Sequence, residues 1–182
     1  MPTSIRRRLA ASAIGAAVAA VALSSAVVAP AHAAGKTTVG TQVQTSSSKH
    51  CASVGGRNAY QVKGGCRLDD QADGTKFAWD TGGKAAKLEV YKSGSSTLRA
   101  KVEFHPKGGW LWVYDTANDH DQIYVTSSLT GGVIYAPTST SRKIEYRKYP
   151  FNYKEGTKIK FTVWDSFDVK PHHKIGTLTG VC

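Results

Sequence analysis

From residue 87 onward, apolar and polar side chains alternate with a period of two, and this pattern constrains the fold more than any other feature. The clearest run is 98–105, in which four apolar residues take every second position: Leu98, Ala100, Val102 and Phe104. Such alternation is typical of half-buried antiparallel strands. Outside the first 33 residues, no window shows the apolar spacing of a helix. We therefore predict an all-β chain.

The alternating segments predict about seven to eight short strands. They cover 87–92, 98–105, 110–114, 122–126, 132–136, 143–148, 158–164 and 174–181. Turn sequences such as Gly82-Gly83 and Glu155-Gly156 lie between them. Short strands at this spacing are typical of a sandwich or a barrel. We predict an antiparallel β-sandwich.

The N-terminal segment has the pattern of an export signal. Arg6, Arg7 and Arg8 precede a run of small and apolar residues, and Ala31-His32-Ala33 forms a cleavage site. This order predicts a signal peptide over 1–33 and a secreted, extracellular product. Residues 34–50, rich in Ser, Thr and Gln, are predicted to be a flexible linker. The folded domain is then expected over 51–182.

Three cysteines follow the predicted signal peptide, and an oxidising exterior favours a disulfide. Cys51–Cys66 is the preferred pairing because it closes a short loop, although Cys66–Cys182 stays open as an alternative. The remaining thiol is expected to be free, buried or joined to a second chain in a disulfide dimer. A catalytic Cys–His pair is a weaker alternative, because His50 adjoins Cys51.

The charge of the chain favours an anionic partner. Lys and Arg number 24 against 13 Asp and Glu, a formal charge of +11 that falls to +8 without Arg6, Arg7 and Arg8. The predicted anion-binding residues gather in 142–160, interleaved with tyrosines: Arg142, Lys143, Arg147, Lys148, Lys154, Lys158 and Lys160. Such a patch attracts anionic polymers. The alternative is a solvated hairpin whose lysines protect its edges.

Two acidic segments are candidates for a Ca²⁺ site. The predicted ligands are Asp115, Asp119 and Asp121 in the first segment, and Asp165 and Asp168 in the second. Calcium takes six to eight oxygen ligands, several of them carboxylates. The alternative is a pair of ordinary turns, which Asp and Asn favour.

Trp110, Trp112 and Tyr114 lie on one face of a predicted strand. Carbohydrate-binding platforms present aromatic rings in this way. Large aromatic side chains more often fill a core, however, and the core is the preferred interpretation here.

Val163-Trp164-Asp165 followed by Ile175-Gly176, together with Leu111-Trp112-Val113 before Ile123-Tyr124-Val125, resembles the calcium-dependent phospholipid-binding C-two domain. The resemblance covers about residues 110–180. It implies a β-sandwich that holds Ca²⁺ between two loops through Asp115, Asp121, Asp165 and Asp168. The sequence departs from that pattern at Phe167, where the family has an aspartate. The chain is also similar to small secreted actinobacterial proteins of unassigned function.

Common hydrolase and nucleotide-binding signatures, such as G-x-S-x-G, H-E-x-x-H and the P-loop, are missing. We therefore expect a secreted, non-enzymatic binding module for an anionic surface or polymer: cell wall, polysaccharide or lipid headgroup. No certain cofactor is expected, with Ca²⁺ as a candidate modulator, and no specific nucleic acid partner. The alternatives are an inhibitor or toxin-like effector acting through its loops, and a small hydrolase using paired Asp residues.

Overall fold

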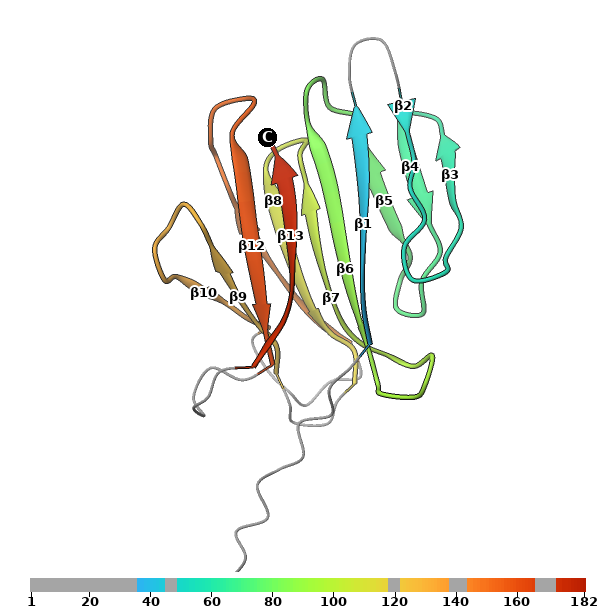
Figure 1. Cartoon of the computed structure of the whole chain (residues 1–182). Helices are drawn as coiled ribbons and strands as arrows, with labels where there is room; N and C mark the ends of the chain where they lie inside the picture. The colour runs from blue at the N-terminus through green and yellow to red at the C-terminus, as the bar shows by residue number, and fades with distance from the viewer. Residues whose placement is uncertain (1–35, 45–48, 118–121, 138–143, 166–172) are drawn as a thin grey trace, which may run out of the picture. The chain divides into compact units, whose positions relative to one another are not determined.

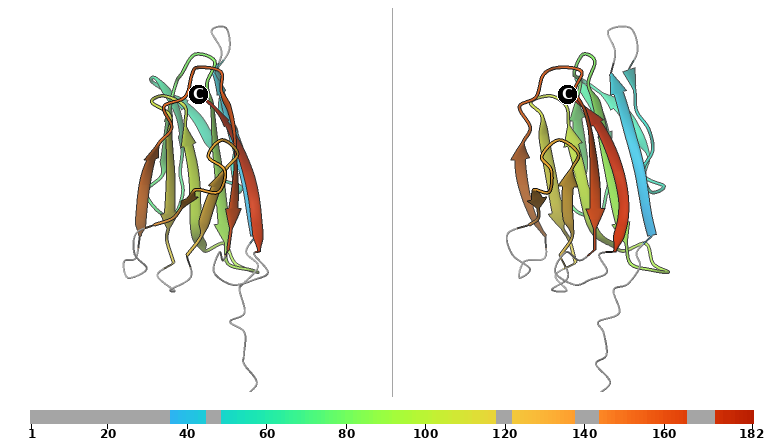
Figure 2. Two further views of the ribbon diagram at one scale, coloured as in Figure 1. Left: turned by 90° about the vertical axis from the view of Figure 1, so that its left-hand side faces the viewer. Right: turned by 60° about the vertical axis from the view of Figure 1, so that its left-hand side comes forward.

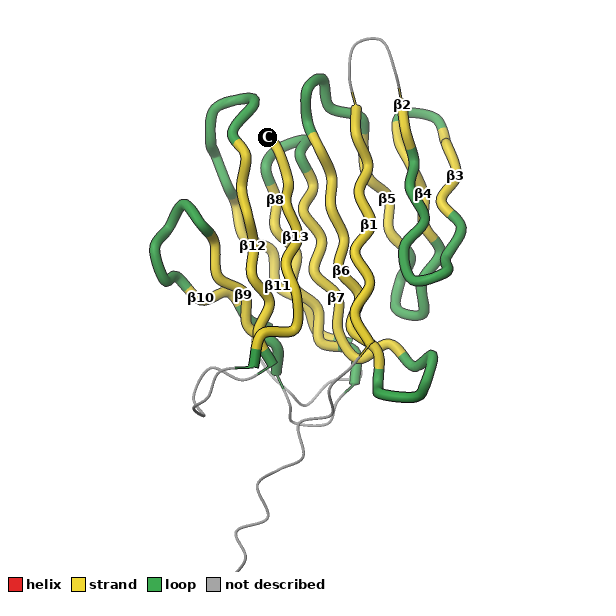
Figure 3. The backbone as a smooth tube through the Cα atoms, viewed as in Figure 1, coloured by secondary structure: helices red, strands yellow, loops and turns green. Residues whose placement is uncertain are grey.

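The computed structural model describes residues 36–44, 49–117, 122–137, 144–165 and 173–182. The chain divides into two units, Met1–Ala31 and His32–Cys182, and everything described below belongs to the second. Every regular element of the described residues is a β-strand, as Figure 3 shows. In these residues no helix is long and apolar enough to cross a membrane.

Two antiparallel sheets make up the described part of the chain (Figure 1). The main sheet has ten strands: β1 (Lys36–Gln44), β2 (Lys49–His50), β6 (Lys84–Tyr91), β7 (Leu98–His105), β8 (Trp110–Asp115), β9 (Tyr124–Ser127), β10 (Ile134–Tyr135), β11 (Glu145–Pro150), β12 (Lys158–Trp164) and β13 (Lys174–Val181). The small sheet has three: β3 (Ala59–Val62), β4 (Gly65–Leu68) and β5 (Thr75–Ala78).

The main sheet is curled around one apolar core (Figure 2). Its strand order is β10-β9-β12-β13-β6-β7-β8-β11, with β1 paired to β6 and β2 to β1. Phe104 on β7 contacts Phe161 on β12 across the core, with 5.4 Å between ring centroids. Gly180 on β13 makes this possible, because a Cβ there would lie 2.0 Å from the Phe104 ring. The Tyr149 hydroxyl of β11 bonds the backbone of Ala136, just after β10, so the two ends of the strand order meet.

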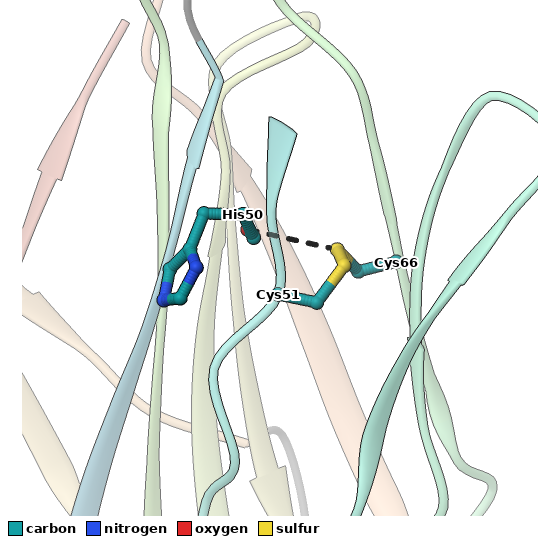
Figure 4. Close-up of a disulfide and its surroundings, with 3 residues drawn as sticks. All are labelled: His50, Cys51 and Cys66. Atoms are coloured by element: carbon teal, nitrogen blue, oxygen red, sulfur yellow. Dashed lines mark hydrogen bonds between the residues drawn. A yellow bond between two sulfur atoms is a disulfide. The ribbon is translucent and has the colours of Figure 1, made fainter. Parts of the chain in front are cut away.

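The small sheet lies against the outer face of β6 and β7. Thr75 of β5 hydrogen-bonds Glu103 of β7, and Phe77 packs on the His105 ring with 4.8 Å between ring centroids. The Cys51–Cys66 disulfide fastens the small sheet to the residue that follows β2, and it confirms the preferred pairing. In Figure 4 the His50 ring points away from the two sulfurs, so no Cys–His pair forms there.

The prediction of an antiparallel all-β chain is confirmed, and three details differ. The two faces of the core belong to one continuous curled sheet rather than to separate sheets. Further strands lie before residue 84, including β1, where residues 34–50 were predicted to be a linker. β1 is polar, but it pairs with β6 from Lys36↔Tyr91 to Val43↔Lys84, and this pairing satisfies backbone groups that no apolar pattern reveals.

Candidate functional site on the outer face of the curled sheet

The outer face of β6, β7, β8 and β11 carries the most unusual side chains of the described residues. The register places them in rows across the strands. One row reads Glu89–Lys101–Tyr114–Tyr146, and the next reads Lys87–Glu103–Trp112–Lys148. Each row begins with charged residues on β6 and β7 and ends with aromatic or exposed residues on β8 and β11. The face therefore has two halves, which we call the ionic cluster and the aromatic platform.

The ionic cluster comprises Asp70, Lys87, Glu89, Lys101 and Glu103, whose side chains are almost completely buried beneath the small sheet. The ammonium group of Lys87 pairs with Asp70 and lies 3.0 Å from Glu89 Oε1 and 3.7 Å from Glu103 Oε1. The Lys101 ammonium lies 2.9 Å from Glu103 Oε1 and 3.0 Å from Asp70 Oδ2. Buried charges are tolerated when they are paired and hydrogen-bonded in this way.

Asp70 is the most densely bonded member of the ionic cluster. Its Oδ1 accepts backbone N–H groups from Ala72 at 2.9 Å, Asp73 at 3.2 Å and Gly74 at 3.1 Å. Its Oδ2 accepts the Thr75 hydroxyl at 3.1 Å, in addition to both lysines. The turn between β4 and β5 therefore wraps one carboxylate oxygen in N–H donors and turns the other toward the main sheet.

Three members of the ionic cluster, Asp70, Glu103 and Lys101, have pKa values shifted toward their charged forms. Burial alone would raise the pKa of Asp70, but the charges and hydrogen bonds of Lys87 and Lys101 outweigh it and lower that pKa well below its usual range. In the same way burial is outweighed for Glu103, where the hydrogen bond from His105 and the two lysines lower the pKa to about 2. The pKa of Lys101 is raised, because Glu103, Asp73 and Asp70 outweigh its burial. The shifts thus favour the charged forms of these three groups.

The aromatic platform comprises Trp110, Trp112, Tyr146 and Lys148, at the open edge of the same face. Tyr146 is 51% exposed and Trp110 is 39% exposed. The rings of Trp112 and Tyr146 are nearly parallel, with an interplanar angle of 11° and centroids 5.8 Å apart. Lys148 Nζ lies 3.8 Å from the centroid of the Trp112 ring, a cation–π contact.

This arrangement corrects the preferred interpretation of the aromatic row. Leu111 and Val113 fill the core, so Trp110, Trp112 and Tyr114 lie on the outer face, where only Tyr114 is fully buried. The neighbouring strand explains why these rings face outward. Tyr114 and Trp112 pair with Lys101 and Glu103 of β7, so the aromatic rings lie beside these charged side chains and not in the apolar core.

The predicted anion-binding residues do not form one patch. Arg147 and Lys148 lie on β11, which pairs with β8, whereas Lys158 and Lys160 lie on β12, which pairs with β9 and β13. The two strands therefore form no hairpin with each other. Lys154 lies in the connecting loop, and all five side chains are exposed. Arg142 and Lys143 lie outside the described residues.

Of the predicted calcium ligands, Asp115 and Asp165 are described, whereas Asp119, Asp121 and Asp168 lie outside the described residues. Because neighbouring strands alternate in direction, β8 and β12 run the same way, so Asp115 and Asp165 lie at the same end of the sheet. Within the described ranges, no three His, Cys, Asp or Glu side chains gather as metal ligands would.

Asp115 has a close acidic neighbour that the sequence did not indicate. Glu145 of β11 pairs directly with Asp115 of β8, and the two residues are only 6% and 2% exposed. Glu145 Oε2 has no hydrogen-bond partner among the described residues. A buried carboxylate oxygen without a donor is costly, and a cation beside Glu145 Oε2 would reduce that cost.

Cys182, the cysteine outside the disulfide, is buried at the C-terminus, with its Sγ 4.0 Å from the carbonyl oxygen of Phe151. Burial raises the pKa of this thiol, with a smaller contribution from the charge of Glu155. A buried thiol of raised pKa does not favour the disulfide dimer that the odd cysteine suggested.

Sequence reasoning missed the ionic cluster altogether. Lys101 and Glu103 alternate with core residues, as solvated side chains of a surface strand do, and nothing local shows that a second sheet covers them. The one available signal is that both signs of charge alternate on neighbouring strands, with Lys87 and Glu89 on one and Lys101 and Glu103 on the next.

The chain matches no protein-family model, and no curated protein or solved structure is significantly similar to it.

Proposed function

We propose that the protein is a secreted, non-enzymatic binding module for an anionic polysaccharide, and that the aromatic platform is its binding surface. The observation that carries this proposal is the Trp112–Tyr146 pair, in which Trp112 is half-buried and Tyr146 is exposed, with Lys148 against Trp112. Flat aromatic rings offer a surface on which the apolar face of a sugar ring can stack. A neighbouring lysine supplies the charge for a carboxylate, sulfate or phosphate substituent.

The supporting structure of the platform favours binding over a loop-based effector function. All four platform residues lie on β8 and β11, which pair over six positions from Glu145↔Asp115 to Pro150↔Trp110. On the opposite face of β8, the side chains of Leu111 and Val113 are completely buried in the core. A site on rigid strands keeps its geometry before the ligand arrives, which lowers the entropic cost of binding.

Calcium is the proposed modulator, acting through the same two strands. The Asp115–Glu145 pair lies one position beyond the Tyr114–Tyr146 pair in the register of β8 and β11. An ion held there would fix the end of the platform. Asp165 is a proposed additional ligand, and Asp119, Asp121 and Asp168, which lie outside the described residues, complete the proposed set.

Affinity electrophoresis in gels containing a polyuronate, a sulfated polysaccharide or neutral dextran tests the proposal. We expect retardation by the anionic gels and at least about a tenfold loss of affinity in Tyr146→Ala, since truncation of a central aromatic contact costs about 2 kcal/mol or more. Lys148→Gln should weaken binding and reduce its dependence on salt.

Lys158→Gln is the matched control, because it removes the same charge from an exposed site on β12, away from the platform. We expect it to bind almost as the unaltered chain does. Equal losses in Lys148→Gln and Lys158→Gln would show diffuse charge attraction and contradict the proposal. Equal retardation by dextran would contradict the requirement for an anionic ligand.

A further inference from the structure

We propose that Lys87 and Asp70 condense into an intramolecular isopeptide bond, which joins the small sheet covalently to the main sheet. Lys87 belongs to β6, and Asp70 belongs to the turn between β4 and β5. Their side chains are in direct contact and both are completely shielded from solvent. An amide between them would be a modification of the fold independent of the aromatic platform.

The two reacting groups are already in contact. The amine nitrogen of Lys87 hydrogen-bonds Oδ2 of Asp70, so it lies beside the carboxyl carbon that it would attack. Such permanent contact replaces a slow encounter between two groups in solution. Well-oriented intramolecular reactions have effective molarities of about 10⁵–10⁸ M.

The other carboxylate oxygen lies in an arrangement that resembles an oxyanion hole. Asp70 Oδ1 accepts the backbone N–H groups of Ala72, Asp73 and Gly74. Attack on the carboxyl carbon places negative charge on this oxygen in the tetrahedral intermediate. Preorganised donors aimed at that charge stabilise the transition state without reorganisation.

Thr75 and Glu103 provide the route for the protons. The Thr75 hydroxyl lies 2.8 Å from Lys87 Nζ and 3.1 Å from Asp70 Oδ2, and it also bonds Glu103. Glu103 accepts a proton from the Lys87 ammonium, whose free amine then forms the C–N bond. The C–Oδ2 bond breaks, and Oδ2 leaves with two protons that came from the nitrogen. The products are one amide and one water molecule, and no oxidant or other reactant is needed.

Lys87 rather than Lys101 is the proposed nucleophile, because its Nζ is the closer of the two to Asp70 Oδ2. Both ammonium groups have several acceptors, which for Lys101 Nζ are Asp70, Asp73, Glu103 and the carbonyl oxygen of Gly74. Lys101 lies 3.0 Å from the leaving oxygen of Asp70 and supplies positive charge beside it.

The surroundings also favour the product. Condensation removes one positive and one negative charge from a site without solvent, so the charge of the remaining cluster is unchanged while two desolvated ions disappear. Lys101 stays paired with Glu103. The same burial keeps water from the finished amide and protects it from hydrolysis.

Mass spectrometry of the full chain, reduced and denatured, tests the proposal. We expect the unaltered protein to be lighter than its sequence by one water, a deficit that Lys87→Arg lacks. Trypsin should leave the bond after Lys87 uncut and yield one branched peptide that joins residues 68–76 to residues 85–92. Glu103→Gln keeps both reacting side chains, and we expect it to have the full mass.

Lys158→Arg is the matched control, because it makes the same substitution at an exposed lysine of β12 and should retain the deficit. An unaltered chain with the full sequence mass overturns the proposal, whether or not any variant folds. A branched peptide joined through Lys101 overturns the assignment of the nucleophile. A deficit that persists in Glu103→Gln removes Glu103 from the proton route.

Discussion

The two halves of the outer face share one set of strands and one alternating pattern, yet they have opposite surroundings. On β6 and β7 the outward residues Lys87, Glu89, Lys101 and Glu103 are buried under the small sheet. On β8 and β11 the outward residues Tyr146 and Lys148 meet solvent. The difference comes from the small sheet, which covers β6 and β7, and not from the strands of the main sheet themselves. A surface pattern becomes an interior when a second element docks on it.

The cover also explains why the two halves have different chemistry. Charges that lose water need partners within a few ångströms, so the ionic cluster is a closed network in which each ammonium has several carboxylates. Aromatic rings at an open edge need no such partner. His105 lies at the boundary, between Phe77 of the cover and Trp112 of the platform, with ring centroids 4.8 and 4.9 Å away.

The largest expected effect comes from breaking the ionic cluster. Lys101→Met leaves Glu103 and Asp70 short of a buried cation, which should lower the free energy of unfolding by about 3–5 kcal/mol. Urea denaturation of the purified chain measures this loss. Lys158→Met removes the same charge from an exposed strand and should stay within about 0.5 kcal/mol. Similar losses in both variants would mean that the cover does not desolvate the cluster.

Acid should weaken the ionic cluster through Glu103. Its pKa falls from 4.5 to about 2 on folding, so the folded state binds a proton less readily than the unfolded state. The resulting stabilisation, roughly 3 kcal/mol, is complete above pH 4.5 and is lost as the pH falls toward about 2. Thermal melts across this range should show the loss in the unaltered chain and a smaller one in Glu103→Gln. A melting temperature independent of pH in both would contradict the ionic cluster.

Calcium should act at the Asp115–Glu145 pair, at the end of β8 and β11. At 100 times its dissociation constant the ion should add about 2.7 kcal/mol to the stability of the chain, measured by melting in EDTA and in millimolar Ca²⁺. Glu145→Gln should abolish the shift, because it removes the charge of the carboxylate whose Oε2 lacks a hydrogen-bond donor. Glu155→Gln, an exposed loop carboxylate, is the control. If Ca²⁺ does not change the melting temperature of the unaltered chain, the Asp115–Glu145 pair does not bind the ion.

The smallest expected effect concerns the stability of the aromatic platform itself. Lys148 is exposed and contacts only ring faces, so Lys148→Gln should change the free energy of unfolding by less than about 0.5 kcal/mol. The same variant should lose polysaccharide affinity, which separates a binding residue from a structural one. A loss of several kcal/mol would place Lys148 in the stabilising framework of the sheet.

Local pattern predicted the strands of the core well. Each of the segments 98–105, 110–114 and 158–164 becomes a strand with one row of residues in the core, such as Phe104, Leu111 and Phe161. The polar strand β1 was predicted to be a linker, because its pairing with β6 depends on backbone groups that every residue carries. The aromatic row was assigned to the wrong side, since alternation defines two faces without saying which one is covered.

The sequence by itself determined the β class and the turns and favoured the disulfide that forms, because alternation, glycine positions and short loop closure are local properties. Only the tertiary structure decided where the polar faces lie. It split the basic residues between β11 and β12, joined Asp115 to Glu145, and placed Asp70 against Lys87. These contacts join residues distant along the chain, and they form only when the sheet curls and the small sheet docks on its outer face.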